Sequence, residues 1–135
     1  MRQSGLSGRL SRPVSGAILC GMKRLDQVFA WTLFVLGIIH SALTPLAYRH
    51  LTLAAVWFFG TGMAFIVTGL LNFIRIRHTG ALALLRGTCI GANSLTFAVA
   101  VAAALVMRTA LPSNPQVPVL LIASFGEILL STRKA

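Results

Sequence analysis

The sequence predicts an all-α fold, namely an integral membrane four-helix bundle with antiparallel neighbours and with both termini in the cytoplasm. Composition is the first reason. Of 135 residues, 56% are hydrophobic and only 10% are charged, and the mean hydropathy is +0.84. An average soluble domain has about 25% charged residues. So few charges could not cover the surface of a soluble domain of this length.

The second reason is a series of four uncharged runs, at 27–48, 51–74, 87–107 and 109–126. A helix rises 1.5 Å per residue, so about 20 apolar residues cross a hydrocarbon core of about 30 Å. Backbone groups inside a bilayer must bond within their own segment, which makes these runs helices. With their flanks they predict spans at 25–47, 51–74, 81–107 and 112–132, together forming one transmembrane domain at 25–132.

The fourth predicted span is the weakest of the four. Pro112, Pro115 and Pro118 crowd its start, and Glu127 interrupts its end. Proline is tolerated in the first turn of a helix but not in its interior, so the helix is expected to begin near Val117. Two interpretations stay open, a short full crossing with local bilayer thinning and a re-entrant segment.

The two ends of the chain are predicted to be polar and cytoplasmic. Residues 1–24 are rich in Ser, Gly and Arg and lack periodicity, which is typical of a disordered basic tail. Met22 followed by two basic residues also resembles the start of a membrane protein, so Met22 is an alternative first residue. Residues 133–135 form the predicted C-terminal tail.

The positions of the basic residues predict the orientation. Lys and Arg accumulate on the cytoplasmic side of a membrane. Ten of the twelve lie in the N-terminal tail, around the second connection or at the C-terminus, and only Arg49 and Arg108 lie on the other side. This alternation fits four crossings of a bacterial inner membrane. It also explains the net charge of +10 without nucleic-acid binding.

Small residues form faces on three predicted helices. Gly87, Gly91, Ser94, Ala98 and Ala102 share one face of the third, and similar faces occur on the first (Ala30, Gly37, Ser41, Thr44) and the second (Ala55, Gly62, Gly69). Such faces let two backbones approach closely. They indicate either packing within the bundle or association in a homodimer or larger membrane complex.

Polar residues inside the spans are the candidate functional residues, because such residues in a membrane are usually functional. They are His40, Thr44, Thr61, Asn72, Arg86, Asn93 and Glu127. His40 is expected at the depth of Thr61, either as an outward ligand or proton site or as a neutral imidazole bonded across the bundle. Glu127 is expected either to pair with Arg75 or Arg86 or to act as a proton- or cation-coupled carboxylate.

The two asparagines are expected to form interhelical hydrogen bonds, since an unbonded amide in hydrocarbon is costly. Asp26 lies in the first turn of the first span, where it offsets the helix dipole. No catalytic, cofactor-binding or metal-ligating residues are predicted. Cys20 and Cys89 lie at different depths, His40 and His78 at opposite ends, and no nucleophile–base pair is present.

Three segments, 39–45 (IHSALTP), 56–62 (VWFFGTG) and 69–72 (GLLN), resemble a group of small four-helix bacterial membrane proteins that are DoxX-like in outline. The resemblance implies that four residues are characteristic positions of this group, namely His40, Thr44, Trp57 and Asn72. It implies no activity and no cofactor. The expected function is therefore a non-enzymatic structural or interaction role in the inner membrane. A small proton- or ion-coupled transporter or channel and an accessory subunit of a membrane redox complex are the alternatives.

Overall fold

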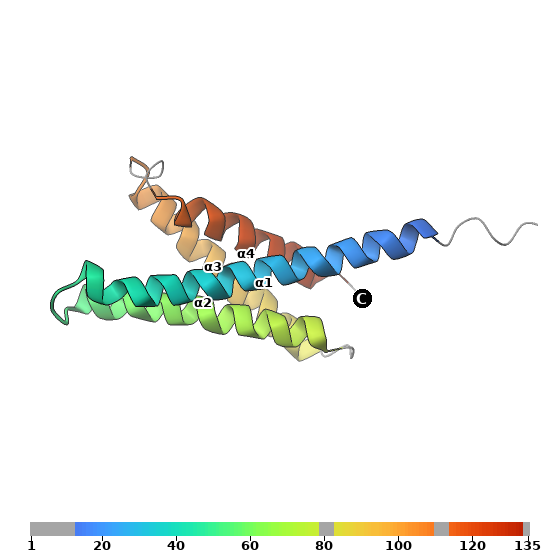
Figure 1. The fold of residues 1–135 in the computed structure, drawn as a ribbon, viewed down its shortest axis with the longest axis horizontal. Coiled ribbons are helices and arrows are strands. Elements are labelled where there is room, and N and C mark those ends of the chain that lie inside the picture. The colour runs from blue at the N-terminus through green and yellow to red at the C-terminus, as the bar shows by residue number, and fades with distance from the viewer. Residues whose placement is uncertain (1–12, 79–82, 110–113, 134–135) are drawn as a thin grey trace, which may run out of the picture.

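The computed structural model describes residues 13–78, 83–109 and 114–133, and their regular structure is helical (Figure 1). The helices are α1 (Pro13–Ala47), α2 (Leu53–Arg77), α3 (Ala83–Val106) and α4 (Gln116–Thr132). Three of them, α1 to α3, are long and apolar enough to cross a membrane, whereas α4 is a shorter apolar helix of 17 residues. The prediction of an all-α membrane protein with four helices is confirmed.

The N-terminal tail differs from its prediction, because α1 begins at Pro13. Residues 13–24 are therefore helical and not a disordered tail. Proline suits the first helical position, and each residue added to an existing helix gains a hydrogen bond, so the apolar span extends toward the N-terminus. In Figure 1 this part of α1 projects beyond the other three helices. The predicted tail at 1–12 and the C-terminal residues 134–135 lie outside the described residues.

Local signals set the ends of the other helices. Thr52 caps α2, since its side chain accepts a hydrogen bond from the Ala55 backbone N–H at 3.1 Å. Helix α4 begins at Gln116, one residue before the start expected near Val117 and four residues inside the predicted span 112–132, and Pro115 takes the N-cap position. Pro118 then falls in the first turn, where a missing N–H breaks no helical bond.

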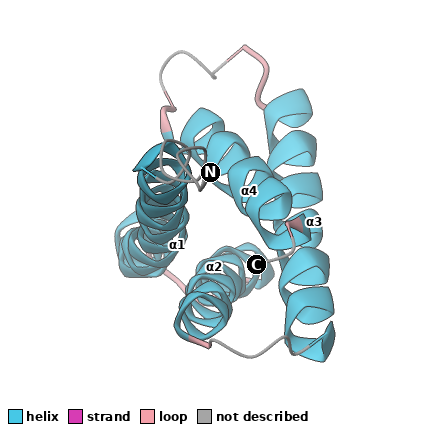
Figure 2. Ribbon diagram, turned by 90° about the vertical axis from the view of Figure 1, so that its right-hand side faces the viewer, coloured by secondary structure: helices cyan, strands magenta, loops and turns pink. Residues whose placement is uncertain are grey.

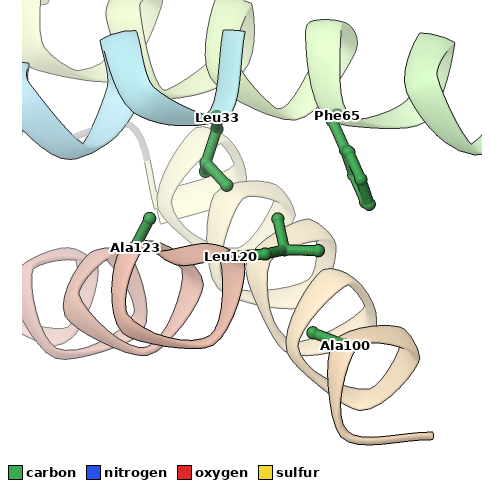
Figure 3. Close-up of a cluster of buried hydrophobic side chains, with 5 residues drawn as sticks. All are labelled: Leu33, Phe65, Ala100, Leu120 and Ala123. Carbon is green, nitrogen blue, oxygen red and sulfur yellow. The ribbon is translucent and has the colours of Figure 1, made fainter. Parts of the chain in front are cut away.

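Two helix pairs make up the bundle. Helices α1 and α2 lie side by side along the length of α2 (Figure 1), and α3 and α4 form the second pair (Figure 2). A small apolar core joins the pairs at their centre (Figure 3). It contains Leu33, Phe65, Ala100, Leu120 and Ala123. Every helix contributes at least one side chain to this core.

The contact between α1 and α2 depends on glycines at the helix crossing. A Cβ atom at Gly37 would lie 2.6 Å from the Gly62 carbonyl oxygen, and one at Gly62 would lie 2.9 Å from the Gly37 carbonyl oxygen. A Cβ at Gly69 would likewise lie 2.9 Å from the Phe34 Cβ. The two backbones therefore touch where no side chain fits. The small faces predicted on the first two helices pack within the bundle.

The small-residue face of α3 behaves differently. Gly87, Gly91, Ser94, Ala98 and Ala102 are all exposed. A Cβ atom at Gly87 or Gly91 would meet nothing within 4 Å. The buried residues of α3 lie on the opposite side of the helix. They are Cys89, Asn93, Thr96 and Ala100. For α3 the interpretation as packing within the bundle is wrong, and this face, called here the open α3 face, is exposed along its whole length.

The two glycine environments predict opposite effects of added methyl groups. Gly37→Ala should destabilise the detergent-solubilised protein by about 1–3 kcal/mol, because the overpacked methyl forces α1 and α2 apart. Gly91→Ala should be neutral or stabilising by up to about 1 kcal/mol, since alanine favours the helix and the methyl meets no neighbour. Thermal unfolding followed by circular dichroism measures both. Equal melting temperatures for the two variants would contradict the α1–α2 contact.

Candidate functional site

The candidate site is a triad of charged side chains from three helices, Asp26 of α1, Arg75 of α2 and Glu127 of α4. The Arg75 Nη2 atom donates to Asp26 Oδ1 at 2.5 Å and to Glu127 Oε2 at 2.8 Å. One guanidinium nitrogen thus holds two carboxylates that are distant in sequence. The triad joins the α1–α2 pair to α4.

The triad is largely withdrawn from solvent. The Glu127 side chain is fully buried, and those of Arg75 and Asp26 are 12% and 14% exposed. Removing charges from water costs several kcal/mol per ion, which only close opposite charges and hydrogen bonds can offset. Within the described part of the chain, Glu127 Oε1 and Arg75 Nε are buried without a hydrogen-bond partner. The triad is therefore paired but not fully satisfied.

An asparagine pair lies beside the triad, one turn before Arg75 on α2. Asn72 Nδ2 donates to Asn93 Oδ1, and Asn93 Nδ2 donates to Asn72 Oδ1, both at 3.0 Å. Both side chains are fully buried. This reciprocal amide pair satisfies two polar groups at once and connects α2 with α3, as the sequence had suggested for each asparagine separately. Nearby, the Cys89 thiol donates to the Leu71 carbonyl oxygen at 3.5 Å.

Arg86 has a different role from the one expected. Its Nε and Nη2 atoms donate to the carbonyl oxygens of Ser131 and Thr132 at 3.2 and 2.8 Å. These are free carbonyls at the C-terminal end of α4, where a cation also complements the helix dipole. Arg86 therefore fixes the end of α4 to α3. The partner of Glu127 is Arg75, the other of the two arginines proposed from the sequence.

The predicted outer site does not join His40 to Thr61. The His40 ring stacks on Phe58, with ring centroids 3.7 Å apart and an angle of 24° between the planes. Thr61 Oγ1 donates to the Trp57 carbonyl oxygen of its own helix at 2.8 Å, so it does not bond His40. Thr44 Oγ1 lies 3.4 Å from the His40 carbonyl oxygen, again within one helix. Thr44 and Thr61 thus bond within their own helices, whereas the His40 side chain packs on Phe58 and hydrogen-bonds the Gln116 side chain at the start of α4. This contact agrees with the expectation of an imidazole bonded across the bundle.

Asp26 is the functional candidate that sequence reasoning missed. Its position in the first turn of the predicted span suggested only an interaction with the helix dipole. The usable signal was its depth, because Asp26 near the start of the first span and Arg75 at the end of the second must lie at the same end of a helical hairpin. It is also the only acidic residue in the chain besides Glu127.

The chemistry available at this site is that of charge pairing, hydrogen bonding and proton binding. The described residues hold no cluster of three or more His, Cys, Asp or Glu side chains that could bind a metal ion. Comparisons with protein-family models, curated proteins and solved structures found no match. The function is therefore argued from the geometry of the triad, the asparagine pair and the open α3 face.

Removing the shared cation should be severely destabilising. Arg75→Gln leaves two carboxyl groups in an apolar site without their counter-charge, and we expect a loss of about 3–5 kcal/mol. Arg77→Gln is the matched control, because Arg77 lies in the same helical turn but is exposed. It should change stability by less than about 0.5 kcal/mol. Unfolding in detergent at fixed pH measures both variants, and similar stabilities would show that the triad does not hold the bundle together.

Proposed function

We propose that this chain is a non-enzymatic, multi-pass protein of the bacterial inner membrane, with four crossings and both termini in the cytoplasm. The charge distribution supports this orientation, with ten basic residues on one side and two on the other. The polar contacts support the same alternation. The triad and Arg86 bring the N-terminal half of α1, the end of α2, the start of α3 and the end of α4 to one end of the bundle.

The crossing of α4 has further support from its contacts. A helix of 17 residues is about 25 Å long, a few Å short of the hydrocarbon core. Arg86, in the first turn of α3, bonds the C-terminal end of α4. The start of α3 and the end of α4 therefore lie at the same depth. Lysine and arginine side chains near helix ends reach the interface, which accommodates a short span. We therefore favour a full crossing over a re-entrant segment.

Reporter fusions test this topology. Green fluorescent protein fused after Ala135 should fluoresce, and alkaline phosphatase fused there should be inactive, because the C-terminus is cytoplasmic. The same two reporters fused after Thr109, between α3 and α4, should give the reverse pattern. Active phosphatase at Ala135 would overturn the four-crossing model.

The role we propose for this bundle is association with a second copy of itself through the open α3 face. The observation that carries the proposal is that this face lies opposite the buried side of α3, is uncharged and has room at Gly87 and Gly91 for a close neighbour. Two such faces are self-complementary, as a two-fold dimer requires. Lipid does not drive helices together by hydrophobicity, so close backbone packing of small residues is the usual basis of association.

The glycine contact between α1 and α2 provides a precedent within the same chain. There, Gly37 and Gly62 let two helices meet at backbone distance. The open α3 face is also made of small residues, but a Cβ atom at its Gly87 or Gly91 would meet no neighbour in the described chain. A structural or interaction role also agrees with the absence of a predicted catalytic group in the sequence.

Disulfide crosslinking in native membranes tests the association. In a variant with Cys20→Ser and Cys89→Ala, Ser94→Cys should give a crosslinked dimer on oxidation. Val35→Cys is the control, because Val35 is exposed near the middle of the first predicted span, on α1, which lies across the bundle from α3 (Figure 2). Adding Gly91→Leu to Ser94→Cys should remove the crosslink without changing the melting temperature of the monomer. A missing Ser94→Cys crosslink, or equal crosslinking at Val35→Cys, would contradict self-association through α3.

A further inference from the structure

The charges of the triad do not balance. One guanidinium, that of Arg75, faces the carboxyl groups of Asp26 and Glu127, and no other described cation forms an ion pair with either of them. With both carboxyl groups ionised the triad would carry one excess negative charge. Glu127 would hold its charge in a fully buried position within an apolar bundle. An uncompensated charge in such surroundings costs several kcal/mol, which is comparable to the whole stability of a small protein.

The two carboxyl groups are also close to one another. Because both accept a hydrogen bond from the same Arg75 Nη2 atom, Asp26 Oδ1 and Glu127 Oε2 lie no more than about 5 Å apart. Two carboxylates at that distance repel each other, and proteins that bring them together commonly retain one proton between them. The second negative charge is then removed without a further cation.

We propose that Asp26 and Glu127 share one bound proton, so that the triad is a proton-binding site inside the bundle. The free acceptor on Glu127 is the independent observation that points to this ligand. Glu127 Oε1 is buried with no donor among the described residues. An ionised oxygen requires a donor, whereas a protonated one donates. With a proton on one of them, the Asp26 and Glu127 carboxyl groups can hydrogen-bond to each other, which two carboxylates cannot do.

The other described charged and titratable side chains near the triad form no ion pair with Asp26 or Glu127. On α3, Arg86 is bonded to backbone carbonyls at the end of α4. Cys89 donates to a backbone carbonyl of α2, and its uncharged thiol also contacts the Arg75 side chain. On α1, Lys23 lies one turn before Asp26 and is exposed to solvent. On α4, Arg133 is exposed and contacts Met22. None of these groups forms an ion pair with Glu127 in the part of the chain that the structure describes.

Proton exchange with water takes place on the Asp26 side of the site. The Asp26 side chain is 14% exposed, whereas that of Glu127 is completely covered. A proton can therefore enter at Asp26 and be held between the two carboxyl groups. Proton-coupled transport, the alternative function expected from the sequence, would need a site of this kind. The inference does not rest on self-association, and either proposal can fail alone.

The first experiment detects the proton directly. We would record infrared spectra of the full-length protein in proteoliposomes between pH 5 and 9. A protonated carboxylic acid has a C=O stretching band that is separate from carboxylate bands and shifts in deuterium oxide. The band should be present at pH 7 and weaken as the pH rises. Because the folded state would then hold one proton more than the unfolded chain, the melting temperature should also fall with rising pH.

The second experiment assigns the proton by isosteric variants. Glu127→Gln and Asp26→Asn each keep an acceptor for Arg75 and leave one carboxylate against one guanidinium, so each should abolish the band. The decisive variant is Asp26→Asn, which removes the band although Glu127 is still present. Dicyclohexylcarbodiimide, which reacts with protonated carboxyl groups in apolar surroundings, should label the wild-type pair and neither variant, as read by mass spectrometry.

Three results would overturn the proposal. One is a wild-type protein without the band at pH 7, a measurement that needs no variant. Another is a band of full strength in Asp26→Asn, which would mean that burial alone protonates Glu127. The third is a melting temperature with the same pH dependence in the wild type and in Glu127→Gln. The crosslinking of Ser94→Cys is read separately, so the outcome for self-association stays distinguishable.

Discussion

The hydrogen bonds from one nitrogen of Arg75 to Asp26 and Glu127 are the interaction on which the arrangement of the helices depends. In a bilayer the hydrophobic effect does not hold apolar helices together, because lipid tails are as apolar as the helix surfaces. Packing and polar contacts must do so. The Arg75 guanidinium joins three of the four helices, and the asparagine pair beside it adds the fourth. Both lie in one layer near one end of the bundle.

Close packing and polar bonding have separate tasks in this bundle. Helices α1 and α2 are held at backbone distance by their glycines, and that contact runs past Gly37, Gly62 and Gly69. The α3–α4 pair is attached mainly through polar groups at one end and through the small central core. The first contact fixes the distance between two helices. The second fixes which faces of α3 and α4 turn inward, because a buried amide or carboxylate must meet its partner.

This inward orientation has a consequence for α3. Asn93 and Cys89 must face α2, so the small residues on the other side of the helix are directed outward. The same helix therefore presents a bonded polar side to the bundle and a smooth glycine-containing side to the lipid. The surface proposed for self-association, the open α3 face, therefore lies on the opposite side of α3 from the side that faces the triad, the site proposed for proton binding. They are independent in geometry as well as in their tests.

Much of the fold follows from the sequence, because hydrophobic length and the need to bond every backbone group dictate helices at these positions. The pairing of Glu127 with an arginine could also be predicted, since a lone carboxylate in a span needs a cation. Arg75 and Arg86, the two candidate partners named from the sequence, both lie at the Glu127 end of the bundle. The helical state of residues 13–24 could not be predicted, because their composition resembles that of a polar tail and only continuity with α1 makes them helical.

What the sequence by itself determined is which residues are small, polar or charged and how deep each lies along its helix. Only the tertiary structure decided which way each residue faces. The rotation of each helix about its own axis is set by its contacts with other helices. These rotations place Asp26 in the triad, pair Glu127 with Arg75 and not with Arg86, and stack His40 on Phe58. The same rotations closed the glycine faces of α1 and α2 on each other and left that of α3 open.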